Sequence, residues 1–243
     1  MKTMKNLILC ALTLCFVFML SCKKDDETEN NDKSLLFVPG DYSSIQAAIN
    51  ASSDGDTIMV DPGTYKENIN FNGKEVIVQS CNPEDQGSVE TTIIDGNGEG
   101  TVVTFDSGET ESAVLNGFTI INGDAGTSNG GGILITNSSN PVVKNNTITG
   151  NEAKYGAGIC VSGESQPSFI NNIIKSNTAA GSRGAGIYVI GMSSVTIDNN
   201  VFKDHIDCDG VIHIGSTSTD ECDAVITNNT IENNTTSFGT GGI

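Results

Sequence analysis

The sequence is poor in basic residues. Its 12 lysines and arginines stand against 30 aspartates and glutamates, for a formal net charge of −18, and Arg183 is its only arginine. Binding of nucleic acid needs clustered Lys and Arg to neutralise phosphates, so this composition argues against that class of partner. It also disfavours tight contact with anionic lipids or polyuronates unless a divalent cation such as calcium bridges the charges. Acidity of this degree is typical of an exposed protein that stays soluble.

Long apolar runs are absent beyond the N-terminus. The run from Leu7 to Leu20 follows Lys2 and Lys5. It is shorter than the roughly 20 residues of a membrane-spanning helix, and its pattern is typical of a secretory signal. It ends in Phe18-Met19-Leu20-Ser21-Cys22, which resembles the lipobox of bacterial lipoproteins. The resemblance implies a signal peptide over residues 1–21 and a lipid on Cys22 as the membrane anchor.

A polar segment, residues 22–34, follows the lipidation cysteine. It begins Cys22-Lys23-Lys24-Asp25-Asp26-Glu27 and has almost nothing to bury, which predicts a disordered acidic tether. A lysine pair followed by acidic residues resembles the surface-export signal of Bacteroidota lipoproteins. We therefore expect an outer-membrane lipoprotein displayed on the cell surface, with an inward-facing periplasmic lipoprotein as the alternative.

Cysteine pairs with zinc-site spacing are also missing. None of the seven cysteines forms a Cys-x-x-Cys pattern, so structural thiols are the default expectation. Cys81, Cys160, Cys208 and Cys222 remain once the leader and lipid cysteines are set aside, and in an oxidising compartment they can pair. Cys208 and Cys222 are close enough in sequence to bridge one loop.

The chain contains an internal repeat built on an asparagine pair. Its copies are Val143-Lys144-Asn145-Asn146-Thr147-Ile148, Ile170-Asn171-Asn172-Ile173-Ile174, Ile197-Asp198-Asn199-Asn200-Val201-Phe202 and Ile226-Thr227-Asn228-Asn229-Thr230-Ile231, with Leu115-Asn116-Gly117-Phe118-Thr119-Ile120 as a variant. Successive copies are 28, 26, 28 and 29 residues apart. A glycine-led strand recurs in phase with them, at Gly131-Gly132-Ile133, Gly156-Ala157-Gly158-Ile159, Gly184-Ala185-Gly186-Ile187 and Gly210-Val211-Ile212.

A repeat of this size cannot bury its own hydrophobic face, so the repeats must stack. Short alternating apolar runs predict strands, and each strand can pair in parallel with its equivalent one coil along. Parallel connections are right-handed, so the predicted fold is an all-β right-handed parallel β-helix. Asparagine tolerates the left-handed backbone of a tight turn. We predict that Asn146, Asn172, Asn200 and Asn229 form an internal hydrogen-bonded ladder; a polar binding strip is the alternative.

The N-terminal part fits a capped solenoid. Ser43-Ser44-Ile45-Gln46-Ala47-Ala48-Ile49 predicts a short helix that starts at a serine cap, covers the first core layer and ends by Asp54-Gly55. The strands expected after it are Thr57–Val60, Val76–Gln79, Thr92–Ile94 and Thr101–Phe105.

Three N-terminal segments, at residues 42–50, 55–60 and 62–68, resemble the start of pectin-lyase-like β-helix proteins. The Gly-Gly-Ile and Asn-Asn pattern also resembles the repeats of polymorphic outer-membrane and adhesin-type β-helices. The resemblance covers nearly all of Leu36–Ile243 and implies the fold more than a function. Because Gly241-Gly242-Ile243 opens a new coil, we expect the β-helix domain, residues 35–243, to be truncated at its C-terminus; an end covered by a partner is the alternative.

The catalytic signatures of the resembled families are missing from this domain. The clustered aspartates and Gly-His-Gly of galacturonases do not occur there. Gly63, Tyr65 and Glu67 match the Gly-x-Tyr-x-Glu of pectin methylesterases, but the Asp-Phe-Ile-Phe-Gly segment does not follow. We therefore expect Glu67 to be a surface residue of the cap region. Lyases use Arg or Lys with calcium, for which Arg183 and Lys203 are the candidates, yet the calcium-binding nonapeptide is absent.

One candidate site is the segment Asp204-His205-Ile206-Asp207-Cys208-Asp209, with His213 shortly after. It gathers both histidines and three aspartates, which fits a divalent-metal site or an acid–base pair. A plain polar turn is the alternative.

A second candidate follows from strand alternation. If Ile133, Ile159, Ile187 and Ile212 point inward, then Leu134, Cys160, Tyr188 and His213 form one outward column. Tyr188 beside His213 could then stack on a sugar ring. A covered strip is the alternative.

Two functions remain open on the sequence. One is a non-catalytic surface protein that binds glycans or mediates adhesion, favoured by the regular repeats and the lipid tether. The other is a lyase, esterase or epimerase that acts on acidic polysaccharide. The fold implies neither, because function depends on the site.

Overall fold

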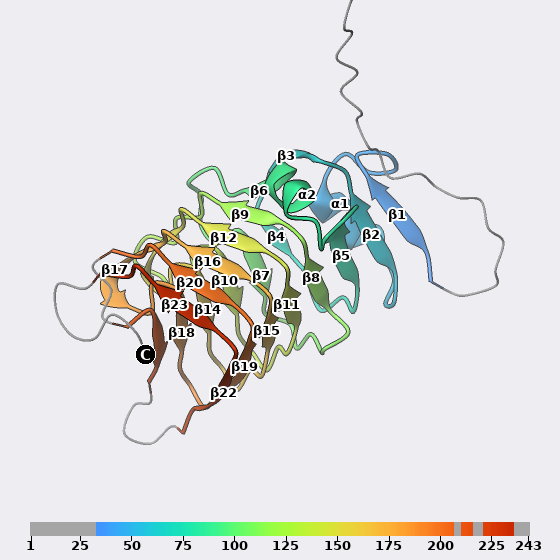
Figure 1. Ribbon diagram of the computed structural model, residues 1–243. Coiled ribbons are helices and arrows are strands. Elements are labelled where there is room, and N and C mark those ends of the chain that lie inside the picture. The colour runs from blue at the N-terminus through green and yellow to red at the C-terminus, as the bar shows by residue number, and fades with distance from the viewer. Residues whose placement is uncertain (1–32, 207–209, 216–220, 236–243) are drawn as a thin grey trace, which may run out of the picture.

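The protein is a single-chain β-solenoid, described by a computed structural model over residues 33–206, 210–215 and 221–235. Its strands stack coil upon coil along one axis, with the N-terminal strands at one end and the last described coil at the other (Figure 1). Three parallel sheets, here named A, B and C, run the length of this stack. The predicted right-handed parallel β-helix with a short N-terminal helix is confirmed. No helix in the described ranges is long and apolar enough to cross a membrane.

The described strands divide among the sheets in chain order. Sheet A holds β1 (Leu35–Val38), β2 (Thr57–Val60), β5 (Ile77–Ser80), β8 (Val114–Asn116), β11 (Val142–Lys144), β15 (Ser168–Ile170), β19 (Ser194–Asp198) and β22 (Asp223–Thr227). Sheet B holds β3 (Gly63–Lys66), β6 (Thr92–Asp95), β9 (Thr119–Ile121), β12 (Thr147–Thr149), β16 (Ile173–Lys175), β20 (Val201–Lys203) and β23 (Thr230–Glu232). Sheet C holds β4 (Ile69–Asn70), β7 (Val103–Phe105), β10 (Ile133–Ile135), β14 (Ile159–Val161), β18 (Ile187–Val189) and β21 (Ile212–Ile214).

Two excursions interrupt the regular coils. One carries α2 (Gln86–Thr91), which packs on sheet B beside β6 and β9. The other is the arm, a two-stranded parallel sheet of β13 (Glu152–Tyr155) and β17 (Thr178–Arg183) that lies between sheets B and C. The sequence did not predict α2, because a six-residue helix is too short to show helical periodicity.

The strand register confirms the repeat. Ile133, Ile159, Ile187 and Ile212 are successive partners in sheet C, and all four are buried. The large aromatic side chains of the core, Phe71, Phe105, Phe118, Phe169 and Phe202, are also fully buried. Side chains from all three sheets therefore fill one continuous core along the axis.

Asparagine side chains, with one histidine, form two columns inside this core that are buried except for their members in the last described coil. In the first column, Asn146, Asn172, Asn200 and Asn229, each backbone N–H donates to the side-chain Oδ1 of the next member, at 2.7–3.0 Å. This confirms the predicted ladder. The second column lies at the corner between sheet B and the arm and contains Asn151, Asn177, His205 and Asn234.

A serine column marks the corner between sheets C and A. The backbone N–H groups of Ser139 and Ser165 donate to Oγ of Ser165 and Ser193, each at 3.2 Å. The column begins at the buried carboxylate of Glu109, which accepts from Oγ of Ser139 at 2.7 Å. Each of these three columns thus satisfies buried backbone donors that the strands leave unpaired.

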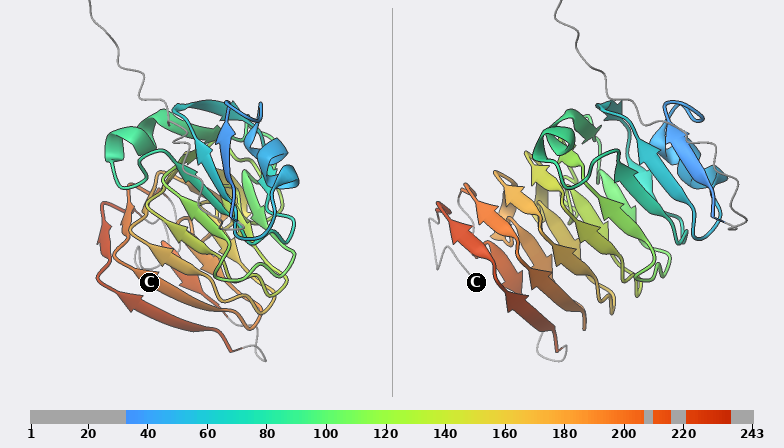
Figure 2. Two further views of the ribbon diagram at one scale, coloured as in Figure 1. Left: turned by 90° about the vertical axis from the view of Figure 1, so that its right-hand side faces the viewer. Right: turned by 45° about the vertical axis from the view of Figure 1, so that its right-hand side comes forward.

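Helix α1 (Ile45–Ala51) covers the N-terminal end of the core (Figure 2). Ser44 is its N-cap and accepts from the N–H of Ala47, as the sequence predicted. Glu67 completes the cap, because its two carboxylate oxygens accept from the N–H groups of Ile45 and Gln46, each at 2.9 Å. A carboxylate at this position satisfies first-turn donors and complements the helix dipole.

Glu67→Ala should lower the free energy of unfolding by about 1–2 kcal/mol, because two helix N–H groups lose a charged acceptor. Urea denaturation followed by circular dichroism measures the change. Lys66→Ala is the matched control, since Lys66, the last residue of β3, is the exposed neighbour of Glu67 in sequence. Equal stability of the two variants would show that Glu67 contributes nothing to the cap.

Candidate functional site

The predicted outward column of sheet C exists, but its two middle members are covered. Leu134, Cys160, Tyr188 and His213 are successive register partners, which confirms that they share one face. Cys160 is only 1% exposed and Tyr188 only 7%. The ring of Tyr188 is therefore too buried to stack directly on a sugar, and the interpretation of this residue as an exposed stacking ring is wrong.

The covering groups are the glycine turns and the arm. Gly156 and Gly184 have φ values of 60° and 58°, and a Cβ on either would lie 2.9 Å from the Cβ of Tyr188. Glycine at these positions lets the backbone pass directly over the column. Tyr155, the last residue of β13, then places its ring 5.2 Å from that of Tyr188.

The result is a row of three aromatic rings that starts at the arm. Tyr188 lies between Tyr155 and His213, whose ring centroid is 5.3 Å from that of Tyr188. Tyr155 and His213 are both partly exposed, whereas Tyr188 is buried between them. Tyr188 therefore supports the two outer rings, and these are the rings that a ligand can reach.

Two cations flank the outermost ring. Nζ of Lys154 lies 5.1 Å from the centroid of Tyr155, and Cζ of Arg183 lies 6.0 Å from it. Tyr155 and Arg183 are register partners across the arm, which explains why they meet. We call Tyr155, Tyr188, His213, Lys154 and Arg183 the aromatic–cation cluster.

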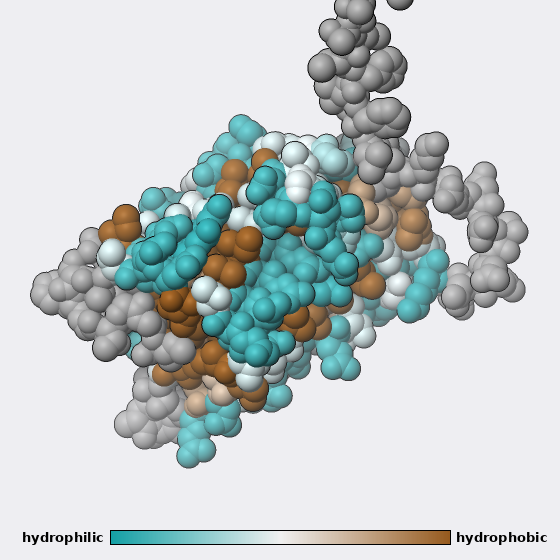
Figure 3. All heavy atoms as spheres, viewed as in Figure 1, coloured by the Kyte–Doolittle hydropathy of each residue, from teal (hydrophilic) through white to brown (hydrophobic). Residues whose placement is uncertain are grey.

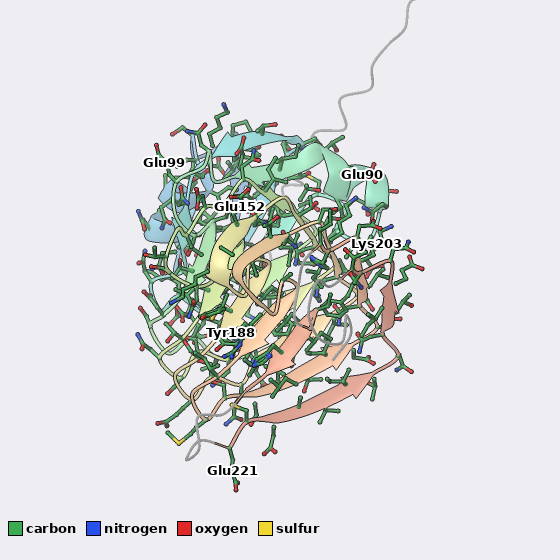
Figure 4. All side chains as sticks on the ribbon, turned by 90° about the vertical axis from the view of Figure 1, so that its left-hand side faces the viewer. Glu90, Glu99, Glu152, Tyr188, Lys203 and Glu221 are labelled. Atoms are coloured by element: carbon green, nitrogen blue, oxygen red, sulfur yellow. The ribbon has the colours of Figure 1, made fainter. Side chains whose placement is uncertain are left out.

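Figure 4 looks onto this side of the molecule. Glu152 of the arm and Tyr188 both lie near the middle of the view, whereas Lys203 lies toward one side. Lys203 belongs to the outer face of sheet B, where it pairs with Lys175. Of the two cations considered from the sequence, only Arg183 therefore joins the cluster.

His205 is not available as an exposed ligand or base. Its side chain is fully buried in the second column, where Nδ1 accepts from the N–H of Asn177 at 3.2 Å and Nε2 lies 3.2 Å from the carbonyl oxygen of Ile174. Asn177 makes the equivalent pair of contacts one coil earlier, to Asn151 and Ile148. The imidazole thus replaces an asparagine amide, and burial lowers the pKa of His205.

The remaining members of that candidate segment do not join His205. Asp204 is exposed at a left-handed turn with φ 60°. Asp207 and Asp209 lie outside the described residues, as does Cys22. Over the described ranges, no three His, Cys, Asp or Glu side chains come together as metal ligands would.

The described cysteines do not show the pairing of Cys208 with Cys222. Cys222 is a free thiol, and Cys208 lies outside the described residues. Cys81 is disulfide-bonded, to neither Cys160 nor Cys222, since both are free. Burial raises the pKa of Cys160 to about 12, which keeps this thiol protonated and unreactive at neutral pH.

The side chains of the Gly-x-Tyr-x-Glu match make structural contacts. Glu67 caps α1, as described above, and the hydroxyl of Tyr65 donates to the carbonyl oxygen of Asp61 at 2.8 Å. Burial, aided by the charges of Asp61 and Glu67, raises the pKa of Tyr65 to about 12. The side chains that match the esterase motif therefore hold the cap together.

Sequence reasoning missed Tyr155 and Lys154. A signal was present, because Tyr155 precedes Gly156 and Arg183 precedes Gly184 at equivalent positions of the repeat. Equivalent positions in stacked coils are neighbours in space, so the pairing of Tyr155 with Arg183 follows from the repeat alone.

The comparisons with known proteins agree with this architecture. No curated protein and no solved structure matches the chain. The model of the right-handed β-helix region matches residues 66–243, which include all the coils that carry the cluster. On this match, and on the three parallel sheets described above, the chain belongs to the right-handed β-helix family.

Proposed function

We propose that the protein is a surface-displayed lipoprotein whose β-helix binds a glycan without catalysis, and that the aromatic–cation cluster is the binding site. The observation that carries the proposal is the row of rings at the arm, flanked by Lys154 and Arg183. The partly exposed rings of Tyr155 and His213 offer apolar faces to a pyranose ring. The two cations can donate hydrogen bonds to its hydroxyl groups.

The same surroundings favour binding over turnover. Burial of Cys160 holds its thiol protonated, and His205 is engaged in the second column. His213 is the remaining histidine, and it packs against Tyr188. The resemblance of the N-terminal segments to pectin-lyase-like proteins supports a carbohydrate as the ligand. Cys22 would anchor the protein in the outer membrane, and residues 22–34 would hold the β-helix away from the membrane surface.

A glycan array, followed by titration calorimetry with the best binder, tests the proposal. Tyr155→Ala should weaken binding by about tenfold or more, because the stacking face is lost. Arg183→Ala, at an exposed position, should also weaken binding. Lys203→Ala is the control, since this lysine lies on sheet B, and it should leave the affinity unchanged.

Turnover assays on the same glycans, with and without calcium, separate binding from chemistry. Unsaturated or de-esterified products that disappear in a Tyr188→Ala/His213→Ala variant would show that the protein is a lyase or an esterase, and would contradict the proposed non-catalytic role. Binding that survives both Tyr155→Ala and Arg183→Ala would place the glycan elsewhere on the solenoid.

A further inference from the structure

A second polar surface lies at the corner between sheets A and B, away from the arm. The first asparagine of each repeat pair forms an outer column there, with Asn145, Asn171 and Asn199 at φ values of 56°, 58° and 55°. Nδ2 of Asn171 donates to Oδ1 of Asn145 at 3.3 Å, and Nδ2 of Asn199 donates to Oδ1 of Asn171 at 2.8 Å. Figure 3 shows hydrophilic residues gathered along this corner.

The outer column differs from the buried first column in what it leaves for a ligand. Asn171 and Asn199 are exposed and Asn145 is half-buried. An amide has two N–H donors and an oxygen with two lone pairs. An asparagine inside the column uses one N–H to bond one neighbour and one lone pair to bond the other. The column therefore presents a donor and an acceptor per coil, repeated at the strand spacing of about 4.8 Å.

The excursion that carries α2 turns part of this column into a groove. Gly117 stands where the next coil has Asn145, and a Cβ on Gly117 would lie 2.4 Å from the Cβ of Pro83. Glycine at this position thus admits the segment that leads into α2. The space between that segment and the column is a groove of about 430 Å³, lined by Pro83, Glu84, Gln86, Val89, Asn145 and Asn171.

The groove has the size and chemistry of a small sugar site. Its volume falls within the roughly 300–1,000 Å³ of small-molecule sites. Three side-chain amides and one carboxylate line it, with Pro83 as an apolar surface and no cation among the lining residues. Amides paired with a carboxylate suit adjacent hydroxyl groups, whereas the carboxylate repels an anion.

We propose that this groove between α2 and the outer asparagine column binds a neutral, hydroxyl-rich ligand, namely a short neutral oligosaccharide. The site is separate from the aromatic–cation cluster, and it selects for uncharged sugars. Binding in the groove needs only contacts with Asn145, Asn171, Gln86 and Glu84. The proposal is therefore independent of whether the aromatic–cation cluster binds a glycan.

Saturation-transfer NMR and calorimetry on the full protein test the proposal with maltotriose, cellotriose, mannotriose and xylotriose as probes. At least one of them should bind the wild type. Asn145→Gly/Asn171→Gly should weaken that binding by about tenfold, because glycine keeps the left-handed backbone but removes both amides. Asn228→Gly is the matched control, because Asn228 has the same left-handed backbone two coils beyond Asn171 and its side chain bonds Asp198 outside the groove, and the affinity of this variant should stay within about twofold of wild type.

Absence of binding by all four trisaccharides would overturn the proposal, as would an unchanged affinity in Asn145→Gly/Asn171→Gly. Loss of binding in Tyr155→Ala but not in the asparagine variant would place the sugar at the cluster alone. The converse pattern would support the groove and would leave the cluster without a ligand.

Discussion

Asn172→Ala should lower the free energy of unfolding by about 3–5 kcal/mol, because it leaves several buried polar groups without partners. Oδ1 of Asn172 accepts from both nitrogens of Asn146, at 3.0 and 3.2 Å. Its Nδ2 donates to the carbonyl oxygen of Val143 and to Oδ1 of Asn200, each at 2.9 Å. Alanine can make none of these hydrogen bonds. Its smaller side chain also leaves a cavity between two coils that is lined by polar groups.

Asn171→Gly is the matched control for this loss. It removes the neighbouring exposed amide and keeps the left-handed backbone, so the free energy of unfolding should fall by no more than about 1 kcal/mol. Urea denaturation monitored by circular dichroism compares the two variants with the wild type. A similar loss in both would mean that the turn conformation, and not the buried column, carries the stability.

His205→Asn should make the protein more resistant to acid. Asparagine occupies the equivalent positions one coil before and one coil after, as Asn177 and Asn234, so an amide fits this place in the second column. Burial lowers the pKa of His205, although hydrogen bonds to Asn177 and Ile174 and the nearby charge of Asp204 partly oppose the shift. Protonation would place a new N–H on Nδ1, which now accepts from the N–H of Asn177.

The direction of the pH effect follows from the lowered pKa. The unfolded chain takes up a proton at the ordinary value of about 6.5, whereas the folded chain resists protonation to lower pH. Stability from the neutral imidazole is therefore complete above pH 6.5 and is lost as the pH falls toward the folded-state pKa. Each pH unit within this window costs the wild type up to about 1.4 kcal/mol relative to the asparagine variant.

Urea denaturation at intervals between pH 5 and pH 8 measures this difference. The gain of His205→Asn over wild type should grow below pH 6.5 and reach as much as about 2 kcal/mol at pH 5. His213→Asn is the control that replaces the other histidine, which lies on sheet C outside the second column. Parallel stability curves for wild type and His205→Asn would show that the buried imidazole does not control acid stability.

The fold could be predicted from the sequence because each coil of the solenoid repeats the same short pattern of strand and turn residues. Equivalent isoleucines recur at nearly constant steps, and stacking them in register is the one way to bury every copy. The first column followed from the Asn-Asn pair, since each copy places its second asparagine at the same point of the turn. Helix α2 is a single insertion, so no repeat indicates it, and the arm occurs in only two coils, in segments of unequal length.

The candidate site was harder to predict because exposure depends on what covers a strand. Alternation correctly assigned Tyr188 to the outer face, but it does not indicate that Gly156 and the ring of Tyr155 lie over that face. His205 was misinterpreted for a related reason. Its neighbours in sequence are acidic and suggest a site, whereas its neighbours in space are the asparagines of the second column.

The three buried columns also determine where the coil length can vary. Five residues separate the first column from the second in four successive coils, from Asn146 to Asn151, Asn172 to Asn177, Asn200 to His205 and Asn229 to Asn234. Seven residues lead from Ser139 to Asn146, from Ser165 to Asn172 and from Ser193 to Asn200.

The corner with the arm is different: eight residues lead from Asn151 to Ile159, ten from Asn177 to Ile187 and seven from His205 to Ile212. From Ser139 to Asn200, the coil length thus varies beside the aromatic–cation cluster, whereas the segment that carries α2 is an insertion at the corner between sheets A and B of an earlier coil. Recognition loops can diversify at the corner with the arm, or be grafted there by design, without any change to the hydrogen-bonded frame that holds the coils together.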